Sequence, residues 1–114
     1  TNNWFPGEVL TDRGDDARYQ NVKSCSFLAA RGARAFREYT PVSFDPADPD
    51  RVFRSFAWGP SLELFILDQR SYRGPNSAND QKEQSDATAF LGRRQLEWLK
   101  RKLAASKATW KIIC

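Results

Sequence analysis

The sequence predicts a layered α/β domain in which a small sheet packs against helices. Residues 62–67 form an almost continuous apolar run, LELFIL, which is typical of a strand covered on both faces. Residues 91–105 place leucines at helical spacing with basic residues between them, which predicts an amphipathic helix. The predicted elements follow one another as helix, strand, strand, helix and strand. The 114 residues are enough for one small domain but not for two.

The first predicted helix occupies most of residues 15–39. Phe27, Leu28 and Phe36 recur near helical spacing, and Pro41 ends the helix because the residue before a proline avoids helical geometry. The arginines of residues 31–37 are interpreted as a solvated helix face, which is more frequent than a patch facing phosphate.

Residues 51–58 are rich in aromatic residues and are predicted to form a strand. Only a Gly-Pro-Ser turn separates them from the run at residues 62–67, so the two strands should pair as an antiparallel hairpin. The predicted core side chains of this hairpin are Phe53, Phe56, Trp58, Leu64 and Ile66.

The net charge, the absence of His and the two Cys limit the kinds of partner and metal site that the chain can be expected to have. Net charge is only +4, with both signs interspersed, so a polyanion is a weakly favoured partner. The chain has no His, the commonest general base and transition-metal ligand. Cys25 and Cys114 have no metal or redox spacing and are interpreted as packing thiols. The aspartates of residues 44–50 are explained by turn chemistry, because the Gly and Glu of a calcium loop are absent. No apolar run is long enough for a membrane span, and no signal peptide is visible.

Charged and aromatic residues follow the apolar strand directly. The strand ends on Asp68 and is succeeded by Arg70, Tyr72 and Arg73 in a predicted loop, and ligands of open α/β sheets collect at this edge. Two interpretations remain open. In one, an Asp–Arg pair fixes the loop behind a site, and Tyr72 belongs to the core. In the other, Arg70 or Arg73 donates charge-assisted hydrogen bonds to a phosphate oxygen.

Asn2 and Asn3 are the second candidate group. Their amides can ligate a hard cation through oxygen or donate to a phosphate oxygen. The alternative is an Asx turn in which the side chain satisfies its own backbone.

Three segments together resemble one family. Residues 1–4, TNNW, are similar to the end of the acidic-histidine signature of PhoD-type alkaline phosphatases and phosphodiesterases. Residues 53–73, FRSFAWGPSLELFILDQRSYR, resemble that family's hairpin ending in Leu-Asp-x-Arg-x-Tyr-Arg. Residues 91–114, LGRRQLEWLKRKLAASKATWKIIC, resemble its Leu-Gly-x-x-Gln-x-x-Trp-Leu helix and the following Trp-Lys strand. The order of the segments is the family's order.

The resemblance implies that residues 1–114 are one internal segment of a longer metallophosphoesterase domain. The implied fold is a partial β-sandwich flanked by helices and incomplete at both ends. The strand predicted at residues 110–114, which has no turn after it, agrees with a segment of a longer chain. The implied activity is hydrolysis of phosphate mono- and diesters with calcium and iron, and nucleic acid enters only as a possible substrate.

Most metal ligands of the family lie outside these residues, so the isolated segment is expected to bind no metal stably and to be inactive. The expected roles are Arg70 as catalytic residue, Asn3 and Arg73 as substrate-binding residues, and Asn2 and Asn3 as metal ligands. The longer protein is expected to be exported, to the periplasm or the cell exterior. The alternative function is a non-catalytic module that binds nucleic acid or another polyanion through the basic faces of residues 31–37 and 93–102.

Overall fold

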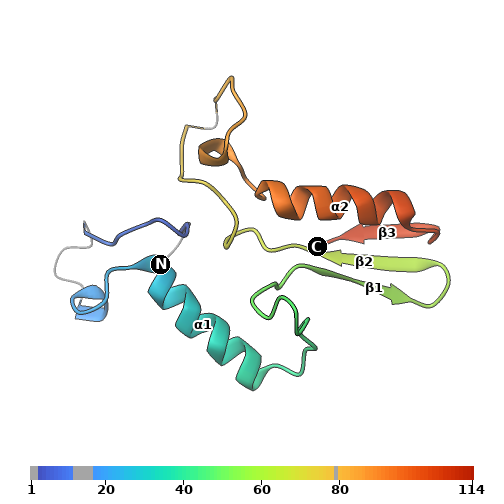
Figure 1. Cartoon of the computed structure of the whole chain (residues 1–114), viewed down its shortest axis with the longest axis horizontal. Coiled ribbons are helices and arrows are strands. Elements are labelled where there is room, and N and C mark those ends of the chain that lie inside the picture. Colours follow the sequence, from blue (N-terminus) through green and yellow to red (C-terminus); the bar gives the residue numbers. More distant parts are fainter. Residues whose placement is uncertain (1–2, 12–16, 79) are drawn as a thin grey trace.

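The computed structural model describes residues 3–11, 17–78 and 80–114, and within them the chain forms a small mixed α/β arrangement (Figure 1). Two helices and a three-stranded mixed sheet are present in this part of the chain, as the sequence predicted for the class. In chain order the elements are η1 (Ala17–Tyr19), α1 (Cys25–Tyr39), β1 (Arg54–Trp58), β2 (Leu62–Ile66), η2 (Asp86–Thr88), α2 (Arg93–Ala105) and β3 (Trp110–Ile113).

The predicted hairpin is confirmed. β1 and β2 pair in antiparallel register, with Phe56 opposite Leu64, and the turn between them uses Gly59 at a φ of 65°. β1 begins at Arg54, three residues later than the predicted strand at residues 51–58. β3 then lies on the other side of β2 and runs parallel to it, so that α2 forms the crossover between two parallel strands.

The core lies between α2 and one face of the sheet. Its buried cluster consists of Phe53, Phe65, Trp98 and Leu99, with Leu67, Tyr72 and Leu103 packed at its margin. The rings of Phe53 and Trp98 are 4.9 Å apart between centroids. Burying these large side chains is the main favourable contribution to the stability of this layer.

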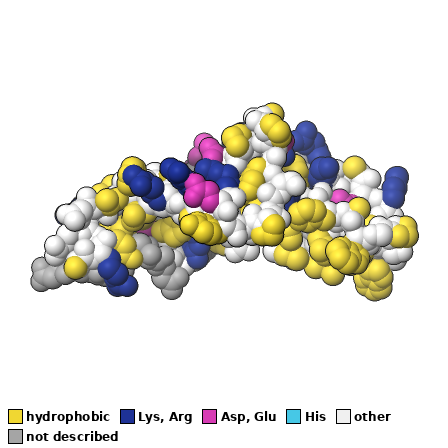
Figure 2. Space-filling view, turned by 90° about the horizontal axis from the view of Figure 1, so that it is seen from below, with side chains coloured by type: hydrophobic (Ala, Val, Ile, Leu, Met, Phe, Trp, Pro, Cys, Tyr) yellow, Lys and Arg dark blue, Asp and Glu magenta, His cyan; other side chains and the backbone are white. Residues whose placement is uncertain are grey.

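The opposite face of the sheet is uncovered in the described structure. Phe56 and Trp58 were predicted core residues but are 45% and 73% exposed, and Trp110 of β3 is 68% exposed. Successive side chains of a strand point to opposite faces, so placing Phe53 and Phe65 under α2 turns Phe56 and Trp58 outward. The prediction that Phe56 and Trp58 belong to the core is therefore wrong. In the apolar run itself Phe65 is buried, whereas Leu64 and Ile66 on the outer face are half-buried, so the run is fully covered on one face only. Figure 2 shows hydrophobic side chains gathered at the end of the molecule that carries the sheet.

Helix α1 begins ten residues after the start of the predicted helical segment. Ser24 accepts a hydrogen bond from the backbone N–H of Phe27 and so caps the first turn. The helix ends at Tyr39, and Thr40 before the proline is extended, as predicted. The helix lies apart from the three strands (Figure 1). Its arginine face is solvated as predicted, with Arg34 paired to Glu38 in the same helix.

The described chain is more open than a typical domain of its length. Its radius of gyration is 16.8 Å, whereas about 13 Å is typical of 114 residues. Its accessible surface is 8572 Å², against about 6400 Å² for a folded monomer of its mass. No helix in the described residues is long and apolar enough to cross a membrane.

Candidate functional site

The loop after β2 is folded by Asp68. The carboxylate oxygen Oδ1 of Asp68 accepts hydrogen bonds from the backbone N–H groups of Arg70 and Ser71, each at 2.9 Å. This is an Asx-type turn, in which a short side chain replaces a backbone acceptor. Asp68 therefore fixes the loop, as one of the two interpretations required, but it does so through the backbone and not through the predicted Asp–Arg pair.

A chain of hydrogen bonds joins this loop to the N-terminal segment. The Arg70 guanidinium donates from Nη2 to Oδ1 of Asn3 at 3.1 Å, across 67 residues of sequence. The Asn76 amide donates to the backbone oxygen of Asn3 at 2.7 Å and accepts from Arg73 Nη2 at 2.8 Å. Asn3 has a φ of 57°, a left-handed conformation that asparagine tolerates better than most residues. The structure thus brings together Asn3, Arg70 and Arg73, while Asn2 lies outside the described residues.

Each of the two guanidinium groups keeps one buried nitrogen without a hydrogen-bond partner in the described residues. These atoms are Nη1 of Arg70 and Nε of Arg73. Arg73 also stacks over the ring of Phe90, with 5.2 Å between its central carbon and the ring centroid. A buried N–H without an acceptor is costly, so the arrangement favours a ligand that supplies acceptor oxygens and negative charge.

The loop is held from behind by α2. Gln95 is fully buried, and its side-chain amide accepts from Asp68 N at 2.7 Å and donates to Asp68 O at 2.8 Å. The same amide donates to Leu91 O at 2.9 Å. Gln95 was not among the predicted site residues. Its signal was its position three residues before Trp98 and four before Leu99, which places it on the buried face of α2.

Tyr72 packs at the margin of the core, which confirms the structural interpretation of this residue. Its ring contacts Phe53 edge to face, with 5.3 Å between centroids. Burial raises the pKa of the Tyr72 hydroxyl above its usual 10.0, and the negative charges of Asp48 and Asp68 add to the effect. The side chain therefore keeps its proton well into the alkaline range.

A cavity of about 520 Å³ opens beside the loop. One wall is the face of α1 that carries Ala29 and Gly32, and the other is the loop segment with Gln69 and Arg70. The guanidinium of Arg70 thus lies at the border between an apolar hollow and the hydrogen-bonded cluster around Asn3. The arrangement leaves room for a ligand next to Arg70.

The described residues do not fit a metal centre by themselves. No group of three His, Cys, Asp or Glu side chains close enough to hold a metal ion occurs among them. The amide oxygen of Asn3 accepts from the Arg70 guanidinium, and a divalent cation at that oxygen would be repelled by the positive charge. Cys25 is buried and contacts Glu8 at 3.4 Å, while Cys114, interpreted as a packing thiol, is exposed.

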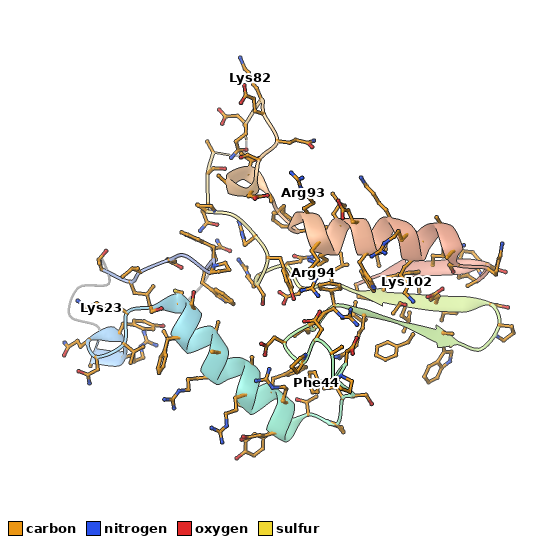
Figure 3. The ribbon with its side chains drawn as sticks, viewed as in Figure 1. Lys23, Phe44, Lys82, Arg93, Arg94 and Lys102 are labelled. Atoms are coloured by element: carbon orange, nitrogen blue, oxygen red, sulfur yellow. The ribbon has the colours of Figure 1, made fainter. Side chains whose placement is uncertain are left out.

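Some of the basic side chains on the two helices pair with carboxylates, whereas others, such as Lys100 and Arg101, are exposed. Arg37 pairs with Asp50 at 2.8 Å, and Arg94 pairs with Asp48. Figure 3 shows Arg94 at the first turn of α2, directed toward the connector that carries Phe44. The aspartates of this connector thus serve turns and ion pairs, in agreement with the interpretation against a calcium loop.

Comparison with known proteins identifies the family to which the chain belongs. A family model described as PhoD-like phosphatase matches residues 1–114, so the chain belongs to the PhoD-like phosphatase family. It is 31% identical over 103 residues to alkaline phosphatase D of Bacillus subtilis (strain 168), an alignment that covers 82% of this chain. The chain spans 18% of the length of that relative. No solved structure matches the chain significantly.

Proposed function

We propose that this chain is part of a PhoD-like phosphatase that hydrolyses phosphate mono- and diesters, with Arg70 and Arg73 facing the phosphate group. The observation that carries the proposal is that two buried guanidinium nitrogens without an acceptor among the described residues, Arg70 Nη1 and Arg73 Nε, lie in one loop; the other such nitrogens belong to Arg54 within β1. Arg70 and Arg73 follow β2 at its carboxyl end, where ligands of α/β sheets bind. Membership of the PhoD-like family supplies the reaction class.

In this proposal the two arginines act by charge. Negative charge spreads over the phosphoryl oxygens as the ester bond breaks, and preorganised donors aimed at these oxygens lower the barrier. Arg70 is the proposed catalytic residue because the hydrogen bond to Asn3 already fixes one edge of its guanidinium. Arg73 is the proposed second donor, oriented by Asn76 and by the Phe90 ring. Asn3 belongs to substrate binding because it orients Arg70.

Calcium and iron are proposed for the longer protein only. As the family resemblance implies, the ligands are proposed to lie mainly outside residues 1–114. Asn2 is the proposed contribution of this segment, and Asn3 could contribute only if its side-chain oxygen exchanged Arg70 for the metal. The 114 residues alone are then expected to bind neither metal stably and to be inactive.

For the fold of the longer protein we propose a metallophosphoesterase β-sandwich, of which residues 1–114 form one internal, partial segment. Its support is the apolar sheet face that carries Phe56, Trp58 and Trp110. Parallel strand pairs such as β2 and β3 are generally buried on both faces, whereas α2 covers only one. A second layer of the longer protein is proposed to cover the other face.

Export of the longer protein to the periplasm or the cell exterior is also a proposal, based on the family resemblance. Nucleic acid is proposed only as a possible phosphodiester substrate. The alternative of a non-catalytic polyanion-binding module is weakened by the pairing of Arg34, Arg37 and Arg94 with carboxylates. Exposed basic residues of α2, Lys100, Arg101 and Lys102, are what would still support it.

The test is turnover of a chromogenic phosphodiester by the full-length protein supplied with calcium and iron. Arg70→Gln is expected to lower kcat/KM at least about tenfold, the effect of one charge-assisted hydrogen bond made in the transition state. Arg93→Gln is the matched control, because Arg93 is exposed at the start of α2. Equal effects of the two substitutions would contradict the role of Arg70. Turnover by the 114 residues alone, above a metal-only control, would contradict the assignment of the metal ligands to other segments.

A further inference from the structure

We infer that Gln95 is a positioning residue that, together with Gly92, sets the conformation of the loop that presents Arg70 and Arg73, and thereby the affinity of the site for a phosphate group. The inference rests on the proposed function for its ligand. It rests on contacts within the described chain for the positioning role.

The first observation is that Gln95 hydrogen-bonds the peptide unit on each side of Asp68. Its amide oxygen accepts from Asp68 N and its amide nitrogen donates to Asp68 O, so both backbone groups of that residue are fixed by one side chain. The third bond, to Leu91 O, fixes the amide itself against the backbone just before α2. A glutamate would lack the two donors, and a methionine would fill the same volume with no polar contact. The position therefore requires the amide group and not only its size.

The second observation is that Asp68, which Gln95 holds, is joined to Arg70 by direct hydrogen bonds. Asp68 holds the backbone N–H groups of Arg70 and Ser71 with its carboxylate. Arg70 in turn reaches Asn3. A shift of the Asp68 backbone would move the origin of the Arg70 side chain, and hence the direction in which its unpartnered nitrogen points.

The third observation is a close approach at the other end of the same loop. Gly92 has a φ of 74°, and a Cβ there would lie 2.6 Å from Tyr72 O and 2.7 Å from Tyr72 Cβ. Only a glycine allows the loop backbone to lie this close to the start of α2. The loop is thus fixed at Asp68 by Gln95 and at Tyr72 by Gly92, with Arg70 between the two points.

The experiment compares Gln95→Met with Leu99→Ala in the full-length protein. Leu99 is buried on the same helix and belongs to the core cluster against which Leu67 and Tyr72 pack, but its apolar side chain makes no hydrogen bond to the loop backbone. Binding of inorganic phosphate is measured by titration calorimetry, and hydrogen–deuterium exchange is followed for residues 67–74. Gln95→Met is expected to weaken phosphate binding at least about tenfold and to speed exchange in residues 67–74, since two bonds to Asp68 are lost. Leu99→Ala is expected to leave phosphate affinity within about twofold while speeding exchange in α2 and the sheet.

The inference is overturned if Gln95→Met binds phosphate as tightly as the wild type, whatever its loop exchange, because Gln95 would then be structural only. If Gln95→Met does not fold, the wild-type protein provides the test. Its Gln95 side-chain amide protons and the Asp68 backbone N–H must be protected from exchange, and rapid exchange of both refutes the hydrogen bonds between Gln95 and Asp68. A wild-type protein that neither binds phosphate nor turns over esters would overturn the proposed function, and loop exchange alone would then support or overturn the positioning role.

Discussion

Truncation of Phe53 should destabilise the chain far more than truncation of Phe56, although both are phenylalanines three residues apart. Phe53 is 1% exposed and Phe56 is 45% exposed. Phe53 contacts the ring of Tyr72 at 5.3 Å and that of Trp98 at 4.9 Å. Phe53→Ala is therefore expected to cost about 3–5 kcal/mol, in the upper part of the range because two ring pairs are lost with the buried volume. Phe56→Ala removes roughly half of a buried side chain and leaves no closed cavity, so about 1 kcal/mol is expected.

The assay is urea unfolding of the 114-residue chain, followed by tryptophan fluorescence. With a slope of about 1–3 kcal/mol per molar urea, an expected difference of about 2 kcal/mol separates the two midpoints by about 0.7–2 M. Phe53→Leu is the milder variant to use if Phe53→Ala is unfolded without urea. Equal midpoint shifts for the Phe53 and Phe56 substitutions would refute the assignment of the two faces of the sheet.

The same pair of variants tests the proposed second layer in the full-length protein. If another layer covers the outer face of the sheet, Phe56 becomes a core residue and its truncation should cost about 3–5 kcal/mol there. Trp58, which is 73% exposed in the described chain, should show the same increase. A Phe56→Ala cost of about 1 kcal/mol in both forms would contradict the sandwich.

Three further outcomes are expected. Asn3→Ala removes the acceptor for a guanidinium hydrogen bond of 3.1 Å and should lower kcat/KM of the full-length protein about tenfold, whereas the exposed Asn21→Ala should change it little. Gly92→Ala should destabilise the fold by at least about 1 kcal/mol, because Gly92 has a positive φ and an added Cβ would collide with the backbone of Tyr72. Gly32 lies within α1 with open space around it, so Gly32→Ala should instead stabilise the fold by about 0.5–1 kcal/mol; thermal unfolding measures both. The pKa of Tyr72 is raised in the folded state, so the unfolded chain loses this proton at a lower pH than the folded chain does. The free energy of unfolding should therefore fall as the pH rises above about 10. Tyr72→Phe should remove the contribution of this residue to the decrease.

Local patterns in the sequence predicted the hairpin and α2 well, because each depends on residues close in the chain. The choice of buried face did not follow from the same patterns. Residues on both faces of the β1–β2 hairpin are apolar, so alternation cannot tell which side the helix covers. Trp98 and Leu99 settle it by packing on Phe53 and Phe65. The start of α1 is determined by its N-cap residue, Ser24. The apolar periodicity does not include this residue, so the helix start was predicted too early.

The site was predictable in its residue types but not in its connections. Arg70 and Arg73 could be selected because they follow a strand, and Asn3 because of its amide. The contact between Asn3 and Arg70 spans 67 residues and leaves no local signal. Gln95 was missed because a polar residue in an amphipathic helix is ordinarily assigned to the solvent side. Gln95 is fully buried, and a polar residue in register with the apolar face of a helix generally has a hydrogen-bond partner in the backbone that it packs against.

The distribution of packing in this chain bears on how the arginines would work. The loop of residues 67–74 is anchored on the side of α2, where Gln95 and Gly92 meet its backbone and the buried core lies directly behind. Its other side faces the cavity along α1. A phosphate group entering from the cavity would thus meet Arg70, whose backbone is already held by Asp68, so that little ordering of this residue would remain to be done on binding. Donors that are preorganised in this way stabilise developing charge more effectively than donors that must first be ordered. The rigid anchor at α2 and the open side toward α1 are therefore both requirements of the proposed phosphate site.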